Sequence, residues 1–227
     1  MTEKYGIDHC IVETPNMVTL VGAGRVNKGV YEQIRKLAPT LIAADGGAEM
    51  VLKYGDLPEK VIGDLDSLTD AIRAKIPEDR ICGIAEQETT DFDKCLRSIK
   101  APLIIGLGFM GRRVDHFLSA MNVLARHAPG KCILVNKRQI CFHVPQDFVM
   151  SVPVGARISL FPMKAVSGQS SGLRWPIDGL VLEPSGRVGT SNEADQDRVR
   201  LMLDGTGLLA IMKRAVLPQA IDALLLR

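Results

Sequence analysis

With 227 residues, 46% of them hydrophobic and 24% charged, the chain is long enough for one or two globular domains and is not expected to be disordered. A formal net charge of +2, without a run of lysines or arginines, argues against a nucleic-acid or membrane partner. The five cysteines are odd in number and lack a CxxC motif, the N-terminus lacks the features of a secretory signal, and no apolar stretch is long enough to cross a membrane, so we expect a cytoplasmic protein with reduced thiols.

The first part of the chain alternates apolar runs with helical patterns. Apolar runs that predict strands lie at 18–21, 40–44, 60–62, 80–84, 103–107 and 132–135. Helical patterns occupy 28–37, 46–54, 69–75, 91–99 and 114–127. This alternation predicts an α/β domain with a mostly parallel, layered sheet, which we place at residues 1–138.

The second part has a different pattern. Short extended runs at 139–144, 157–161, 179–182, 198–203 and 208–213 are separated by clusters of Pro, Gly, Ser, Asn and Asp, and helical periodicity returns only at 217–226. These features predict an all-β sandwich, which we place at residues 139–227.

Polar and glycine-rich segments follow the predicted parallel strands, where ligands of such sheets bind. They read GAGR (22–25), ADGGA (44–48), GDLDS (63–67), TTD (89–91) and GFMGRRVDH (108–116). Asp64, Asp66 and Asp91 offer the oxygen ligands that Mg²⁺ prefers, and in an extended backbone Asp64 and Asp66 would point to the same side, roughly 7 Å apart. Glycines, Arg112 and Arg113 suit phosphate binding, so the segments together predict a magnesium and polyphosphate site.

Each of these residues also has a simpler explanation. Asp115 and Thr90 stand where helix caps and first-turn residues are common, and Asp93 fits a capping box. The GAGR segment lacks the third glycine of a dinucleotide fingerprint and is weak evidence for NAD. A cap needs only one polar residue, however, so capping does not explain the pair Asp64 and Asp66.

The order and spacing of ADGGA, GDLDS, QETTDFDKCL (87–96) and GFMGRRVDH resemble the thiamine pyrophosphokinase family. In the second half, ISLFPM (158–163), GLRWPIDG (172–179) and GTSN (189–192) are similar to the thiamine-binding β domain of that family. The resemblance implies transfer of pyrophosphate from ATP to the hydroxyl of thiamine with Mg²⁺, giving thiamine diphosphate and AMP. It also implies a jelly-roll-like β domain and a homodimer with the active site shared between subunits.

Site residues carried over by the resemblance fall into three groups. Asp64, Asp66 and Asp91 would hold magnesium and take part in catalysis with Gln87. The ATP-binding residues would be Asp45, Gly46, Thr90, Lys94, Arg113 and Asp115. Ser191 and Asn192 would contact thiamine, whereas Trp175 belongs to the signature of the β domain and would serve in packing rather than as a ligand.

The sequence departs from the family at two places. Glu86 and Glu88 stand where some relatives have Asp, and Ala210 stands where some relatives have an aromatic residue that stacks on thiamine. Alternatives are a related diphosphokinase of the pterin type, a non-catalytic ATP-binding sensor and, less favoured, a nicotinamide dehydrogenase. A pterin-type enzyme should lack the TSN-bearing β domain.

Overall fold

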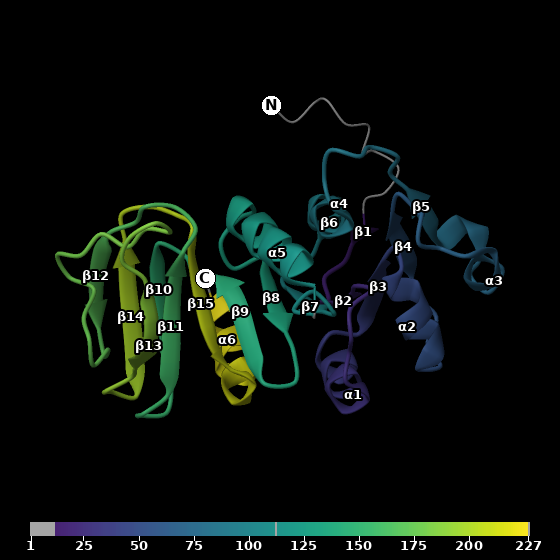
Figure 1. Cartoon of the computed structure of the whole chain (residues 1–227). Coiled ribbons are helices and arrows are strands. Elements are labelled where there is room, and N and C mark those ends of the chain that lie inside the picture. The colour runs from purple at the N-terminus through teal and green to yellow at the C-terminus, as the bar shows by residue number, and fades with distance from the viewer. Residues whose placement is uncertain (1–11, 112, 227) are drawn as a thin grey trace. The chain divides into compact units, whose positions relative to one another are not determined.

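The computed structural model describes residues 12–111 and 113–226 (Figure 1). The chain divides into two compact units between Val123 and Leu124, inside helix α5 (Val114–Arg126). The domain boundary predicted from the sequence, between residues 138 and 139, comes after strand β8 (Cys132–Val135) and stays a prediction.

The first unit contains a parallel sheet with the strand order β7-β2-β3-β4-β5. Its strands are β2 (Val18–Val21), β3 (Thr40–Ala44), β4 (Lys60–Gly63), β5 (Ile81–Gly83) and β7 (Ile104–Leu107). Strands β2, β3 and β7 are buried at every position, as expected of a sheet that is covered on both faces. Since β3 and β7 flank β2 on opposite sides, the strand order reverses between β2 and β7, which is where sheets of this kind bind ligands.

Helices of the first unit begin within one residue of the starts that the sequence predicts. They are α1 (Lys28–Leu37), α2 (Gly47–Lys53), α3 (Asp70–Arg73) and α4 (Asp91–Ser98), with the 3₁₀ turn η1 (Glu78–Arg80) before β5. The side chain of Thr90 caps α4 by accepting a hydrogen bond from the backbone N–H of Asp93. Helix α4 packs against β3 and β4, so its first turn lies at the carboxyl ends of these strands. Two short strands that the sequence did not predict, β1 (Val12–Glu13) and β6 (Ile99–Lys100), pair in parallel.

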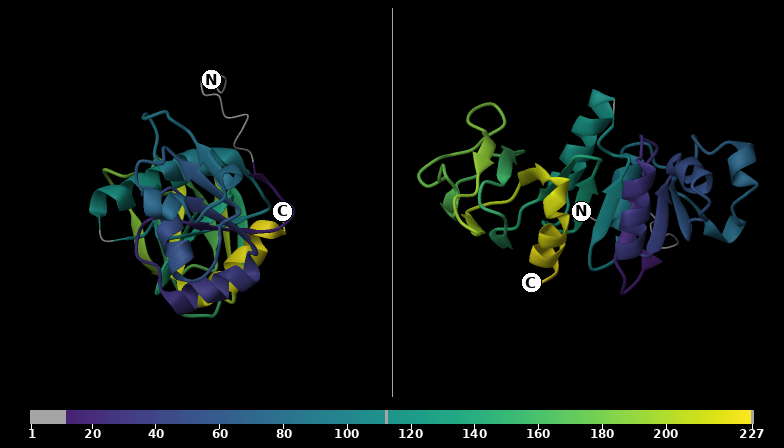
Figure 2. Two further views of the ribbon diagram at one scale, coloured as in Figure 1. Left: turned by 90° about the vertical axis from the view of Figure 1, so that its right-hand side faces the viewer. Right: turned by 90° about the horizontal axis from the view of Figure 1, so that it is seen from below.

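Strands of the second unit pair in antiparallel fashion in two sets, with the orders β13-β11-β15-β9-β8 and β10-β14-β12. Besides β8, the strands are β9 (Gln139–His143), β10 (Asp147–Ser151), β11 (Arg157–Pro162), β12 (Gly168–Ser171), β13 (Gly189–Glu193), β14 (Arg198–Leu203) and β15 (Leu208–Lys213). Phe142 of one sheet and Phe148 of the other bring their ring centroids to 5.5 Å in the core. The turn η2 (Arg214–Val216) leads into helix α6 (Leu217–Leu225), which packs against β10; Figure 2 shows α6 in yellow from two further directions.

The predicted fold class, an α/β unit followed by antiparallel β structure, is confirmed. Two local predictions were wrong. Residues 179–182 form only an isolated bridge between Val166 and Leu182, because Gly179 has a positive φ of 71° that interrupts an extended run. Cys82 is disulfide-bonded and not a reduced thiol, whereas Cys95, Cys132 and Cys141 are free and buried.

Among the helices that the structure describes, none is both long and apolar enough to span a bilayer.

Candidate active site

Three carboxylates converge at the carboxyl edge of the parallel sheet. Asp45 follows β3, Asp64 follows β4, and Asp91 is the first residue of α4. One carboxylate oxygen of each residue lies within 4.8 Å of the others, the only group of this kind among the described residues. Residues from three separate segments therefore form one acidic cluster, named here the Asp45–Asp64–Asp91 cluster.

Gly63 makes this convergence possible. A Cβ atom at position 63 would lie 2.7 Å from the Cβ of Asp45 and 2.9 Å from Oδ1 of Asp91, which is closer than real side chains allow. Any other residue at the end of β4 would push the carboxylates apart. The sequence motif GDLDS contained this glycine, but the motif alone did not reveal what the glycine contacts.

Asp45 is the most constrained member of the cluster. Its backbone has a positive φ of 39°, only 2% of its surface is exposed, and Oδ2 accepts a hydrogen bond from the backbone N–H of Ser67 at 3.1 Å. Its other oxygen, Oδ1, is buried without a hydrogen-bond partner among the described residues. Burial raises the pKa of the Asp45 carboxyl, because removal from water disfavours its charged form more than the hydrogen bond from Ser67 favours it.

Asp64 and Asp91 are joined by direct contacts. The backbone N–H of Asp64 donates to Oδ1 of Asp91 at 3.3 Å, and Nζ of Lys94 lies 3.2 Å from Oδ2 of Asp64 and 3.3 Å from Oδ1 of Asp91. Burial raises the pKa of Asp91, although Lys94 opposes this shift. For Asp64, burial is the largest single influence and acts in the same direction, but the hydrogen bonds from Lys94 and Asp66 and the charge of Lys94 together outweigh it, so the pKa of Asp64 is lowered.

The cluster fits a divalent cation. Its donors are carboxylate oxygens, the ligands that Mg²⁺ prefers, and the unpartnered Oδ1 of Asp45 is a buried oxygen that a cation would satisfy. The lysine offsets only one of the three acidic charges when all three carboxyls are ionised. The residues present therefore suit a bound Mg²⁺ chemically.

Asp66 does not belong to this group, contrary to the geometry expected from the sequence. Strand β4 ends at Gly63 and Leu65 has a positive φ of 68°, so the chain is not extended between Asp64 and Asp66 and enters a turn at residues 66–67. The backbone N–H of Asp66 donates to Oδ1 of Asp64 at 3.4 Å, and its exposed carboxylate accepts from the hydroxyl of Ser67 at 3.0 Å. The structure thus brings together Asp45, Asp64 and Asp91, and leaves Asp66 beside them.

Two glycine loops meet at the point where the strand order reverses. The backbone N–H of Gly24, after β2, donates to the carbonyl of Gly108, after β7, at 3.1 Å. A Cβ at Gly24 would lie 2.1 Å from that carbonyl oxygen, and Gly108 has a positive φ of 83°. Phe109 then packs its ring on Phe92 of α4 with centroids 4.4 Å apart. This backbone-lined edge can accept phosphate groups.

The loop between β5 and α4 carries Gln87 and Thr90, which are both exposed. A half-buried ionic contact holds the loop: Nη2 of Arg97 on α4 lies 3.3 Å from Oε1 of Glu86 and donates to the hydroxyl of Thr89 at 2.8 Å. Thr89 in turn donates to Glu86. Sequence reasoning missed Arg97, and its signal is slight, since Arg97 looks like one more charged residue on an amphipathic helix.

The remaining predicted nucleotide residues occupy different environments. Gly46 is the N-cap of α2, and Arg113 and Asp115 form an exposed ion pair before and within α5. The hydrogen bond from Arg113 lowers the pKa of Asp115 to about 2. Both side chains are more than half exposed and so remain accessible to a nucleotide from solvent. Arg112, the other arginine expected to suit phosphate binding, lies outside the residues that the structure describes.

In the second unit, Ser191 and Asn192 lie on strand β13. Ser191 is exposed with a positive φ of 61°, whereas Asn192 is buried and its side-chain amide is occupied by backbone groups. Its Oδ1 accepts from the N–H groups of Trp175 and Glu193, and its Nδ2 donates to the carbonyl of Trp175 at 2.7 Å. Trp175 is 54% exposed, which does not fit the packing role expected from the sequence, and Cζ of Arg174 lies 5.0 Å from the centroid of its ring. Asn192 therefore holds the segment that presents Trp175.

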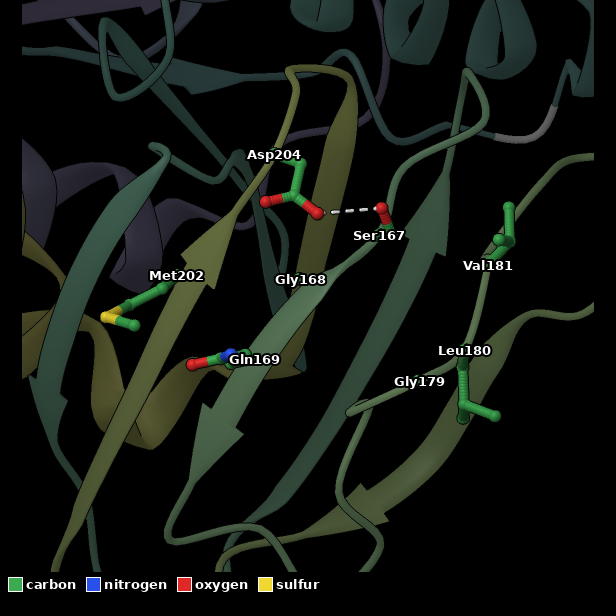
Figure 3. A pocket seen from close by; sticks show the side chains of 8 residues that line it. All are labelled: Ser167, Gly168, Gln169, Gly179, Leu180, Val181, Met202 and Asp204. Carbon is green, nitrogen blue, oxygen red and sulfur yellow. Dashed lines mark hydrogen bonds between the residues drawn. The ribbon is translucent and has the colours of Figure 1, made fainter.

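A separate pocket of about 460 Å³ lies in the second unit (Figure 3). It is lined by Ser167, Gly168, Gln169, Gly179, Leu180, Val181, Met202 and Asp204. Its one carboxylate, Asp204, accepts a hydrogen bond from the Ser167 hydroxyl at 2.8 Å. The pocket contains none of the predicted site residues, and we assign it no ligand.

Comparison with known families gives two matches along this chain. Residues 31–135 match the family described as thiamin pyrophosphokinase, catalytic domain, and residues 140–206 match thiamin pyrophosphokinase, vitamin B1 binding domain. Together they cover most of the chain. The first match contains the Asp45–Asp64–Asp91 cluster, and the second contains Ser191 and Asn192.

Individual proteins that are similar to this chain carry the same family name. Thiamine pyrophosphokinase 1 from Oryza sativa subsp. japonica is 26% identical over 212 residues, which cover 85% of this chain and 76% of that protein. Thiamine pyrophosphokinase 1 from Arabidopsis thaliana is 24% identical over 206 residues, with coverages of 75% and 76%. The solved structure of yeast thiamin pyrophosphokinase superposes with a TM-score of 0.73 at 18% identity and covers 93% of this chain and 90% of its own. The thiamin pyrophosphokinase from Candida albicans gives a TM-score of 0.72 at 16% identity, with coverages of 87% and 89%. At these identities, the structural likeness supports the fold alone.

Proposed function

This chain belongs to the thiamin pyrophosphokinase family, and we propose that it transfers the β,γ-pyrophosphoryl group of ATP to the hydroxyl of thiamine. The products are thiamine diphosphate and AMP. The observation that carries the proposal is the convergence of Asp45, Asp64 and Asp91 inside the region that matches the catalytic domain of the family.

We propose that Asp45, Asp64 and Asp91 hold Mg²⁺, with Asp66 beside them. Bound Mg²⁺ neutralises negative charge on a polyphosphate, which is the main electrostatic requirement of phosphoryl transfer. The buried, unpartnered Oδ1 of Asp45 and the hydrogen-bonded pair Asp64 and Asp91 support this assignment. Asp66 is exposed and hydrogen-bonded to Asp64 through its backbone, so we assign it a supporting role in the turn.

ATP is proposed to bind along the same sheet edge. The backbone groups of the glycine loops at 22–25 and 108–111 and the N-cap residue Gly46 can approach phosphate oxygens, and Arg113 can pair with them in a bidentate manner. Binding of ATP to Arg113 would compete with its contact to Asp115. Thr90 caps the helix that carries Asp91 and would border the phosphates.

The reaction forms a bond between the thiamine oxygen and the β-phosphorus and breaks the bond from that phosphorus to the oxygen that departs with AMP. The hydroxyl of thiamine also loses its proton. Asp91 can accept this proton or orient the hydroxyl, and Gln87 can orient it without removing the proton, since an amide is not a base at neutral pH. The contacts of Arg97, in the last turn of α4, with Glu86 and Thr89 hold the Gln87 loop against α4.

Thiamine is proposed to contact the surface formed by Ser191 and Trp175, held in place by Asn192. We further propose a cytoplasmic homodimer whose active site is shared between subunits. Sedimentation velocity tests the dimer. The mass of the sedimenting species should be roughly twice the 24.7 kDa of a single chain.

Purified protein incubated with Mg²⁺, thiamine and ATP labelled at the β-phosphate tests the function. The proposal predicts that label appears in thiamine diphosphate and that AMP forms only when thiamine is present. Formation of ADP, turnover that requires a pterin alcohol instead of thiamine, or ATP binding without turnover by folded protein would overturn it.

A further inference from the structure

Lys94 is a fully buried lysine next to the proposed metal site. Its side chain is 0% exposed, although lysines are almost never fully buried unless they are paired. The ammonium lies 3.2 Å from Oδ2 of Asp64 and 3.3 Å from Oδ1 of Asp91. The two acids come from different segments, the end of β4 and the start of α4, so Lys94 bridges two elements.

The position of Lys94 in α4 keeps it away from solvent. Helix α4 packs on β3 and β4, and the neighbouring residues Phe92, Cys95 and Leu96 are buried in the same interface. A nucleotide approaching from solvent cannot reach the Lys94 ammonium in this conformation. The contact between Lys94 and ATP that the family resemblance implies is therefore not supported by the geometry.

We propose that Lys94 is a positioning residue that holds Asp64 and Asp91 in their metal-binding arrangement before the ion arrives. The lysine occupies Oδ2 of Asp64 and Oδ1 of Asp91, which fixes both carboxyl groups. The oxygens left for an ion are Oδ2 of Asp91 and Oδ1 of Asp64, and the latter also accepts from the backbone N–H of Asp66 at 3.4 Å. It also offsets part of the charge that would otherwise drive the two carboxylates apart. This inference rests on the proposed function only for the identity of the ion as the Mg²⁺ of an ATP-dependent transfer.

Two effects of removing the ammonium act in opposite directions on metal affinity. A more negative site would attract a cation more strongly, whereas acids that are no longer held in place would bind it more weakly. Contacts that orient metal ligands typically change metal affinity by about 10- to 100-fold when they are lost. A positioning role predicts that the loss of orientation outweighs the gain in charge.

The test measures binding of Mn²⁺, as a substitute for Mg²⁺, to the Lys94→Met variant by electron paramagnetic resonance. Methionine retains an unbranched apolar side chain and removes only the charged end. The expected result is Mn²⁺ binding that is weaker by about tenfold or more, together with a lower unfolding temperature of the metal-free protein. Lys94→Gln, which can still donate to one carboxylate, should lie between wild type and Lys94→Met. Unchanged or tighter binding of Mn²⁺ by either folded variant would overturn the proposal.

Lys100→Met is a matched control. Lys100 forms an exposed ion pair with Glu13 at 3.9 Å, so this substitution should leave Mn²⁺ binding unchanged.

A measurement on wild type keeps the inference testable if the Lys94 variants do not fold. An acyl-phosphate derivative of ATP, which acylates lysines next to bound phosphates, should not modify Lys94, and modification at Lys94 would contradict its burial. Neither readout requires turnover, so the absence of thiamine diphosphate formation would reject the proposed function without rejecting the role of Lys94.

Discussion

At the scale of single residues, Asp45 combines three features at the proposed site that lower the stability of the folded protein. It combines a positive φ, near-complete burial and a carboxylate oxygen that no described residue satisfies. Each of these features destabilises a folded protein, and such features concentrate at functional sites. A bound cation would remove the electrostatic part of this cost.

Asp45→Asn should therefore stabilise the metal-free protein by about 1 kcal/mol, the lower end of the cost of a buried unpaired polar group. Asparagine tolerates positive φ, its oxygen can still accept from Ser67, and its amide can donate to the neighbouring carboxylates. Because the pKa of Asp45 is raised, the wild type loses stability as the pH rises through that pKa, and the gain should be absent at low pH where Asp45 is protonated.

Calorimetry of the two proteins without metal, across pH 4 to 8, measures this effect. Asp66→Asn is the control, since the Asp66 side chain is exposed and its substitution should leave stability nearly unchanged. A variant at position 45 that is less stable than wild type at neutral pH, or that still binds Mn²⁺ normally, would contradict the account.

Trp175 gives a second prediction at the residue scale, because it is the single tryptophan of the chain. Its backbone is held by the amide of Asn192, next to the exposed Ser191. Thiamine binding should therefore change tryptophan fluorescence, excited at 295 nm, whereas Mg²⁺-ATP alone should not. Thiamine that saturates the enzyme in the activity assay without any change in emission would exclude Trp175 from the thiamine-binding surface.

The sequence predicted that acids gather at this sheet edge but not how all of them are arranged. Asp45, Asp64 and Asp91 follow predicted strands or begin a predicted helix, so their convergence follows from parallel topology. The position of Asp66 depended on the turn at Leu65, whose positive φ has no signal in a leucine. The bridge made by Lys94 was equally hidden, since burial of a lysine depends on packing between elements.

At the scale of elements, the glycine loops show how backbone contacts shape the proposed nucleotide edge. The loops after β2 and β7 touch through Gly24 and Gly108 with no space for a side chain. Elements with strong periodicity, such as α1 and β14, could be predicted to the residue. Strand β12, with the sequence GQSS, could not, because it is short and polar and acquires its strand geometry only by pairing with β14.

Gly24→Ala should destabilise the protein by about 1–3 kcal/mol, since the new Cβ would overlap the carbonyl of Gly108 and force the loops apart. The KM for ATP should rise more than the KM for thiamine, because the displaced backbone belongs to the proposed phosphate edge. Steady-state kinetics and thermal unfolding measure both effects.

Gly29→Ala is the matched control for this substitution. Gly29 lies near the start of α1, where an added Cβ comes no closer than 3.5 Å to the Asn27 side chain, and alanine should stabilise the helix by about 0.5–1 kcal/mol. Equal effects of the two substitutions on the KM for ATP would refute the assignment of the Gly24 loop.

At the scale of the whole molecule, the chain consists of two units with different architectures, as the change of sequence pattern predicted. The parallel unit holds the acidic cluster, and the antiparallel unit holds Ser191 and Trp175.

His143 makes the antiparallel unit sensitive to pH. It is buried, its Nδ1 lies 2.9 Å from the carbonyl of His127, and its Nε2 accepts from the backbone N–H of Gly207 at 2.8 Å, so the ring is neutral. Burial lowers its pKa below the unfolded value of about 6.5. The unfolded chain therefore binds the proton more readily, and stability should fall as the pH decreases from about 6.5 toward the folded pKa.

Unfolding temperatures of wild type and His143→Gln between pH 8 and 5 check this prediction. At pH 8 the variant should have a lower unfolding temperature than wild type, because it loses the packing and hydrogen bonds of the imidazole. Its unfolding temperature should then fall less on acidification. His116→Gln alters an exposed histidine and should keep the wild-type profile. A His143→Gln profile parallel to wild type would show that another group controls the acid sensitivity.

The central claim is that Asp45, Asp64 and Asp91 hold the divalent ion that accompanies ATP. Anomalous diffraction from crystals containing Mn²⁺ and α,β-methylene-ATP, which cannot transfer its pyrophosphoryl group, tests this most directly. The account predicts a manganese peak within about 2.0–2.4 Å of carboxylate oxygens of these residues, with phosphate oxygens completing the shell. A nucleotide bound with its manganese ion elsewhere, and with the three carboxylates making no contact to it, would contradict the claim.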